Sequence, residues 1–199
     1  MTLWNKAQEW EQSWWGNCIN TFYEEEKQLV YADKMGLERC GNDKTPYVYD
    51  LHGISVLDIG GGVCSILLKC INIKRGVVID PLSMPEWVID RYTHKNIVFD
   101  NIKGEDIEKE PNGNTFDEVW VYNVLQHTEN PKKVVENAKA IGKTIRIFEW
   151  IDTPINEGHI HTLRENDLND WLGGFGKVEM MNYRPARGKA YYGVFPTKL

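Results

Sequence analysis

The chain has 199 residues, 42% of them hydrophobic and 26% charged, which is ordinary for a globular protein. Its 23 basic and 29 acidic side chains leave a net charge of −6, so it has no general attraction for nucleic acid or an anionic membrane. No apolar run approaches the ~20 residues of a membrane span, and the first residues do not resemble a secretory signal. We expect a cytoplasmic protein that uses neither nucleic acid nor a membrane as partner.

The first 53 residues are expected to form a helical extension. Four residues at helical spacing share one face of a first helix: Leu3, Ala7, Trp10 and Trp14. A second helix is expected over 21–35, with an exposed acidic run at 24–26. Glycines then break the pattern, and an irregular stretch follows.

From residue 54 onward, short apolar runs alternate with helical segments. Strands are expected at 54–59, 76–80, 96–100, 116–123 and 143–150. Helices are expected at 65–73, 84–92 and 131–140, and after a capping box formed by Thr162 and Glu165. Such alternation indicates a parallel sheet that is covered on both faces.

Two further strands are expected near the C-terminus, at 177–183 and 190–195. The connection between them, which contains Pro185, is too short for a helical crossover, so these strands should pair antiparallel. The sequence therefore predicts an α/β fold with a doubly wound, mostly parallel sheet and an antiparallel C-terminal strand. Residues 54–199 form this domain, and residues 1–53 form the N-terminal helical extension or lid.

The segment Val56–Gly62 is the most informative stretch, because a strand runs into three glycines and then into a helix. Such a turn allows close approach of a ligand, and a helix N-terminus offers free amides. Gly60 and Gly62 match the start of a dinucleotide fingerprint, but its third glycine position holds Ser65. Asp58 would repel a pyrophosphate and would suit a ligand that carries an ammonium and a sulfonium.

This segment, VLDIGGG, resembles the first motif of the class I (Rossmann-like) S-adenosylmethionine-dependent methyltransferases. Four further segments resemble motifs of that family in the correct order: 76–80, 104–106, 116–127 and 158–162. The last resembles a segment of the ubiquinone-biosynthesis-like and sugar methyltransferases, the type 11 group. The resemblance covers 54–199 and is weaker after residue 150.

The resemblance implies S-adenosylmethionine as cofactor and assigns roles to individual residues. Cofactor contacts are expected from Asp58, Gly60, Gly61, Gly62, Asp80, Pro81, Glu105, Asp106 and Asn123. In the family, the residue matching Asp80 holds the ribose hydroxyls, and the 104–106 loop touches the adenine. His127 and His159 are the candidate general bases, with His161 third, since a histidine pKa near ~6.5 suits proton transfer at neutral pH. Each of these histidines can equally be a hydrogen-bonded structural residue.

Two kinds of chemistry are disfavoured by spacing. Asn123 is followed by Val124 and Leu125 rather than by Pro-Pro and an aromatic residue, which argues against methylation of nucleic-acid amino groups. His159 and His161 lack a third ligand at fixed spacing, and the four cysteines form no C-x-x-C pair. We therefore expect no metal site and reduced, mostly buried thiols.

The expected function is methyl transfer from S-adenosylmethionine to an oxygen or nitrogen of a small-molecule acceptor, such as a sugar or an aromatic metabolite. Two alternatives stay open: a non-catalytic binding subunit with a methyltransferase fold, and a nicotinamide-dependent oxidoreductase. The acceptor and the oligomeric state are not indicated by the sequence.

Four of the eight tryptophans fall within the first fifteen residues, and they admit three interpretations. They can dock a helix on the domain, since aromatic side chains bury large areas. They can close the cofactor site, with an acceptor pocket walled by Trp14, Trp15, Phe22, Tyr23 and Tyr31. They can also form an exposed aromatic patch for dimerisation.

Overall fold

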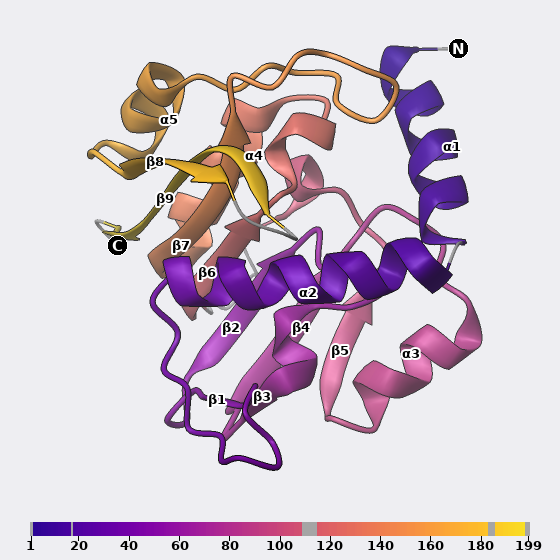
Figure 1. Ribbon diagram of the computed structural model, residues 1–199, viewed down its shortest axis with the longest axis vertical. Coiled ribbons are helices and arrows are strands. Elements are labelled where there is room, and N and C mark those ends of the chain that lie inside the picture. The colour runs from indigo at the N-terminus through magenta and orange to yellow at the C-terminus, as the bar shows by residue number, and fades with distance from the viewer. Residues whose placement is uncertain (1, 17, 109–114, 183–185, 198–199) are drawn as a thin grey trace.

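The computed structural model describes residues 2–16, 18–108, 115–182 and 186–197. Seven strands form one sheet in the order β5-β4-β2-β6-β7-β9-β8 (Figure 1). Their bounds are Ser55–Ile59 for β2, Arg75–Ile79 for β4, Ile97–Asp100 for β5, Phe116–Tyr122 for β6, Gly142–Ile151 for β7, Lys177–Asn182 for β8 and Arg187–Pro196 for β9. The strands from β5 to β7 pair in parallel, and β9 is antiparallel to both β7 and β8. The predicted sheet is thus confirmed, and Pro185 lies outside the described residues.

Helices cover both faces of this sheet, because successive strand residues point to opposite sides. Val56 belongs to a core with α2 (Cys18–Lys34) and α3 (Glu86–Thr93). The next residue, Leu57, belongs to a second core with α4 (Pro131–Ile141) and α5 (Glu165–Leu172). The remaining helix, α1 (Leu3–Trp15), stands beside the loop between β7 and α5, while α2 crosses the strands (Figure 1).

The helix predicted over 131–140 is confirmed as α4, and the predicted capping box is wrong. The Asn130 side chain accepts a hydrogen bond from the Lys133 amide at the start of α4. The Thr162 hydroxyl instead donates to the Thr153 carbonyl, 2.8 Å away. Since that hydroxyl is engaged with the preceding loop, α5 begins later, at Glu165, without a side-chain cap.

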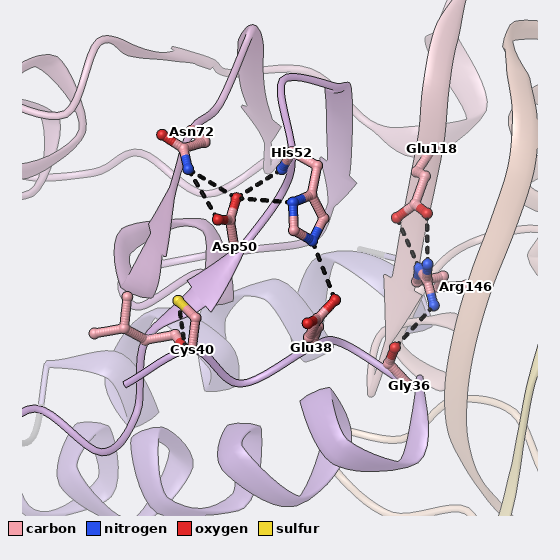
Figure 2. Close-up of polar contacts among 9 residues, drawn as sticks. Gly36, Glu38, Cys40, Asp50, His52, Asn72, Glu118 and Arg146 are labelled. Carbon is pink, nitrogen blue, oxygen red and sulfur yellow. Dashed lines mark hydrogen bonds and ion pairs between the residues drawn. The ribbon is translucent and has the colours of Figure 1, made fainter. Parts of the chain in front are cut away.

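The helix expected over 65–73 is also wrong. Only a 3-10 turn, η1 (Ile66–Lys69), forms there, and β3 (Cys70–Ile71) follows in parallel pairing with β1 (Tyr49–Asp50). The Asp50 carboxylate accepts bonds from the Asn72 side-chain amide, 2.9 Å away, and from the His52 backbone N–H at 2.8 Å (Figure 2). Since these residues bond across to 49–52, they are not free to continue a helix.

The N-terminal segment shares the hydrophobic core of the sheet. Tyr31, Ala32 and Met35 are completely buried against it. In the acidic run expected to be exposed, Glu24 is buried and its carboxylate pairs with Lys27. The division of the chain at residue 53 stays a prediction.

Arg146 on β7 joins the end of this segment to the sheet (Figure 2). Its guanidinium donates to both Glu118 carboxylate oxygens, 2.7 Å away, and to the Met35 carbonyl at 2.7 Å. The two side chains are only 20% and 11% exposed, so the pair is largely removed from water. Such a pair is costly to break from one side, because the remaining charge loses its partner.

Replacement of Arg146 by alanine is therefore expected to lower the free energy of unfolding by about 3 kcal/mol. Urea titration followed by circular dichroism measures this change. The exposed pair Lys132–Glu136 provides the control, since Lys132→Ala should change stability by less than ~0.5 kcal/mol. Equal effects of the two substitutions would contradict the anchoring role of Arg146.

Candidate active site

A cavity of about 700 Å³ lies at the carboxyl ends of the parallel strands, beneath α1. In the sheet, β4 lies on one side of β2 and β6 lies on the other. The chain builds the sheet outward first through β4 and β5 and then through β6 and β7, so the strand order reverses at β2, where the cavity lies. Ligands of doubly wound sheets bind at this switch point. Seven of the predicted site residues line the cavity: Gly60, Asp80, Pro81, Glu105, Asn123, His127 and His159.

The glycine turn after β2 is closely packed. Gly60 has φ +74°, and a Cβ there would lie 2.2 Å from Cγ2 of Val124. A Cβ on Gly61 would lie 2.7 Å from Oδ2 of Asp58. Any side chain at either position would displace the turn, so glycine is required for this backbone path.

Asp58 lies beneath this turn rather than on the cavity wall. Its carboxylate is completely buried and accepts hydrogen bonds from the Ser65 and Tyr122 hydroxyls. Oδ1 has no hydrogen-bond partner among the described residues. Burial raises the pKa of this carboxyl to about 7 despite both bonds. Asp58 thus braces the turn from below, and its direct contact with a cofactor stays a prediction.

The amides that follow the turn are already bonded to tyrosines. The Ser65 amide donates to the Tyr92 hydroxyl and the Ile66 amide to the Tyr122 hydroxyl, each at 3.1 Å. The Tyr92 hydroxyl in turn donates to the Gly62 carbonyl, 2.6 Å away. Sequence reasoning missed both tyrosines, because each lies on a distant element and the resemblance gave neither a role, although Tyr122 falls within the 116–127 segment. These amides therefore stabilise the loop itself.

Asp80 follows β4 and lies at the edge of the cavity with Pro81. Its Oδ1 accepts a hydrogen bond from the Leu82 amide at 2.9 Å, which fixes the carboxylate. Burial raises the pKa of Asp80 to about 7, the Leu82 amide lowers it, and the negative charge of Glu11 raises it further. The side chain is thus a fixed, strongly desolvated acceptor that faces the cavity.

Asn123 and Glu149 shape the wall after β6. Asn123 has φ +52°, and its backbone N–H donates to the Phe148 carbonyl. Glu149, at the end of β7, accepts bonds from the Val124 and Leu125 amides, each at 3.1 Å. Burial raises the pKa of Glu149 to about 7. Glu149 therefore holds this loop and does not line the cavity.

The 104–106 segment forms a 3-10 turn, η2 (Gly104–Asp106). Glu105 lines the cavity, and its Oε1 accepts a bond from the Asn130 amide at 2.9 Å. Asp106 is exposed and lies outside the cavity lining. A cofactor contact for Asp106 stays a prediction, and the position of this side chain outside the cavity does not support it.

The two candidate bases lie side by side, with ring centroids 4.8 Å apart. Nδ1 of His127 lies 2.9 Å from Oε1 of Glu11 and 2.9 Å from the Gly158 carbonyl. Burial is the largest single effect and lowers the pKa of His127, but Glu11, the Gly158 carbonyl and Glu149 together outweigh it, so the net pKa is raised. Burial and the neighbouring His127 lower the pKa of His159 to about 4. His161 does not line the cavity.

Tryptophans form the wall that α1 presents to the cavity. The lining includes Trp4, Trp10, Trp14 and Trp15 of α1. The rings of Trp10 and Trp14 stack with centroids 5.1 Å apart. Of the five aromatic side chains considered for an acceptor wall, Trp14 and Trp15 line the cavity. The three of α2 do not line it, because Phe22 and Tyr23 are exposed and Tyr31 is buried in the core.

Sequence comparison finds no matching protein-family model and no matching curated protein. Solved structures do match. The Burkholderia thailandensis 1,6-didemethyltoxoflavin-N1-methyltransferase, with bound 1,6-didemethyltoxoflavin and S-adenosylhomocysteine, has a TM-score of 0.62 at 13% identity, covering 96% of this chain and 87% of that chain. The N-methyltransferase NodS of Bradyrhizobium japonicum WM9, in complex with S-adenosyl-L-homocysteine, has a TM-score of 0.55 at 16% identity, covering 73% and 79%. A SAM-dependent methyltransferase from Aquifex aeolicus has a TM-score of 0.51 at 18% identity, covering 87% and 90%.

These likenesses show the fold. The chain has the Rossmann-like fold of the class I S-adenosylmethionine-dependent methyltransferases, as its motifs predicted. In the described part of the chain no helix is long and apolar enough to cross a membrane. Within the same residues no three His, Cys, Asp or Glu side chains lie close enough to hold a metal ion.

Proposed function

We propose that the chain is an S-adenosylmethionine-dependent methyltransferase that methylates an oxygen or nitrogen of a small-molecule acceptor. The observation that carries this proposal is the cavity at the switch point of the sheet. Its floor is the glycine turn, its edge is the buried Asp80, and its cover is the tryptophan wall of α1. The cytoplasmic location expected from the sequence belongs to the same proposal.

The residues present fit this cofactor. Asp80 is a fixed acceptor suited to a pair of ribose hydroxyls, and Gly60 places backbone of the tightly packed turn on the cavity lining. Among the described residues, the charged side chains of the cavity lining are five acids, Glu11, Glu24, Asp80, Glu105 and Glu157, and three bases, Lys27, Lys103 and Arg187. This acidic excess favours a cationic ligand. When bound, S-adenosylmethionine supplies an electrophilic methyl group. The protein then provides placement and a site closed to water.

The acceptor side of the cavity is built from aromatic rings. The stacked pair Trp10–Trp14 and the nearby Trp150 offer flat faces to a planar ring or a sugar. The similar structures include an N1-methyltransferase with bound 1,6-didemethyltoxoflavin, which supports a small-molecule acceptor. We therefore propose an aromatic metabolite or a sugar as the acceptor class.

In this proposal His127 and His159 contact the acceptor, and one of them accepts its proton. His127→Ala and His159→Ala are each expected to reduce turnover, by about 10²-fold for the residue that is the base. Affinity for S-adenosylmethionine should stay unchanged in both variants. Transfer of a radiolabelled methyl group to a panel of phenols, aromatic amines and sugars measures turnover. Full turnover in both variants would show that neither histidine is the base, and that the protein catalyses transfer only by placing the acceptor against the methyl group.

The same assay tests the proposal against a non-catalytic subunit with this fold. An enzyme transfers label to at least one acceptor of the panel, with a rate proportional to protein concentration. The binding subunit would be favoured if the protein bound S-adenosylmethionine but transferred label neither to any acceptor of the panel nor to any ligand that co-purifies with the protein.

A further inference from the structure

A carboxylate lies on the side of α1 that faces the cavity. Glu11 and Gln8, one helical turn apart, both line the cavity. The Glu11 side chain is only 13% exposed, although its helix lies at the surface. A helix that served only as a cover would place apolar residues here, because a buried charge is costly unless it is paired.

The partner of Glu11 is His127. Oε1 of Glu11 lies 2.9 Å from Nδ1 of His127, and the Gly158 carbonyl lies at the same distance from that nitrogen. A carboxylate and a carbonyl can only accept, so Nδ1 carries a proton. The Gly158 carbonyl accepts this N–H, and Oε1 of Glu11, which has no hydrogen-bond partner among the described residues, lies beside it at ion-pair distance. Nε2 faces the Gln126 side-chain amide nitrogen at 3.4 Å, which donates. The contacts thus select the tautomer in which the electron pair lies on Nε2.

The placement of α1 depends on the same loop. A Cβ on Gly158 would lie 2.6 Å from the Trp10 ring and 3.2 Å from Oε1 of Glu11. The helix therefore packs directly on the loop that holds His159. When α1 is docked, the cavity is covered and Glu11 reaches His127 at the same time.

We propose that α1 supplies Glu11 as a positioning residue for His127, the base that takes the acceptor's proton. This inference rests on the proposed function and deepens it. In the step, the O–H or N–H bond of the acceptor breaks, its proton passes to Nε2 of His127, and the electron pair stays on the acceptor. Glu11 stabilises the imidazolium that results, as a carboxylate does beside a catalytic histidine.

The charges around His127 and His159 shift the pKa values of the two histidines in opposite directions. Glu11 on α1 and Glu149 on β7 favour its protonated form, while His159 in the adjoining loop opposes a second charge. Lys27 on α2 further disfavours protonation of His159. The pKa of His127 is therefore raised while that of His159 is lowered to about 4, so His127 holds a proton more strongly and is the better base.

The test follows the histidine rings by ¹H–¹⁵N NMR during a pH titration, with His127 assigned from His127→Asn. In the wild-type protein, neutral His127 is expected to carry its proton on Nδ1. In Glu11→Gln, the titration midpoint of His127 should fall by about one pH unit, as after loss of one close opposite charge. The control is Glu9→Gln, which removes an exposed charge from the same helix and should leave the midpoint unchanged.

An unchanged His127 midpoint in Glu11→Gln, or an equal shift in Glu9→Gln, would overturn the inference. A lower midpoint in Glu11→Gln but not in Glu9→Gln would support it. The two proposals can be refuted independently of each other. NMR measures the titration of His127 beside Glu11, whereas calorimetry measures the affinity for the cofactor. Absence of cofactor binding in the wild-type protein would refute the proposed function, and a normal midpoint shift would still establish the pair.

Discussion

Asp80→Ala is expected to weaken S-adenosylmethionine binding by one to two orders of magnitude. Hydrogen bonds to a charged group contribute about 1.5–3 kcal/mol, and this substitution removes the acceptor proposed for the ribose. Isothermal titration calorimetry measures the change. Asp90→Ala, an exposed carboxylate on α3, is the control and should bind as the wild type does. Wild-type affinity in Asp80→Ala would show that Asp80 does not hold the cofactor.

The same contact predicts a pH dependence. The pKa of Asp80 is raised to about 7, so its carboxyl is largely protonated at pH 6 and ionised at pH 8. The ionised form is the stronger acceptor, so the affinity for S-adenosylmethionine should rise between these pH values. This rise should vanish in Asp80→Asn, which keeps the shape of the side chain but cannot titrate. A rise of equal size in Asp80→Asn would assign it to another group.

Stability should change with pH in the opposite direction. The folded-state pKa of Asp58 is raised from 3.8 to about 7, so folding favours its protonated form. The stability linked to this group is fully present below the unfolded pKa and is lost as pH rises to about 7. At 1.36 kcal/mol per pKa unit, Asp58 alone should lower the free energy of unfolding by about 2–3 kcal/mol between pH 5 and pH 8. Glu149 acts in the same direction.

Urea unfolding at pH 5 and pH 8, without cofactor, measures this change. Asp58→Asn should flatten the pH dependence, because the asparagine amide does not ionise. Asp117→Asn is the control: the pKa of Asp117 is lowered by Lys143 and by Ser55, so this carboxyl is ionised throughout the range. A wild-type slope in Asp58→Asn would mean that Asp58 does not titrate in this window.

The sheet and the position of the site could be predicted from the sequence, because both depend on local patterns. Val56–Gly62 combines an apolar run with a glycine turn, and β2 and its turn form there. Asp80 was singled out by the resemblance of the 76–80 segment to a methyltransferase motif, and the structure puts it at the cavity edge. Periodicity and turn chemistry suffice for such features.

Features that depend on contacts between distant elements could not be predicted. The helix expected after the glycine turn does not continue, since Cys70 and Ile71 pair with β1 instead. The burial of Asp58 beneath the turn could not be predicted either, because it depends on the hydroxyl of Tyr122, 64 residues away in sequence. The Glu11–His127 pair likewise joins residues that carry no shared motif. Each outcome is decided by tertiary packing, which overrides local preference.

The most direct test of the account is calorimetric titration of the purified protein with S-adenosylmethionine and S-adenosylhomocysteine, with NADH as control. The account predicts micromolar binding of both sulfur ligands and no binding of NADH. Binding of NADH without either sulfur ligand, or no binding of the sulfur ligands by protein shown to be folded, would contradict it.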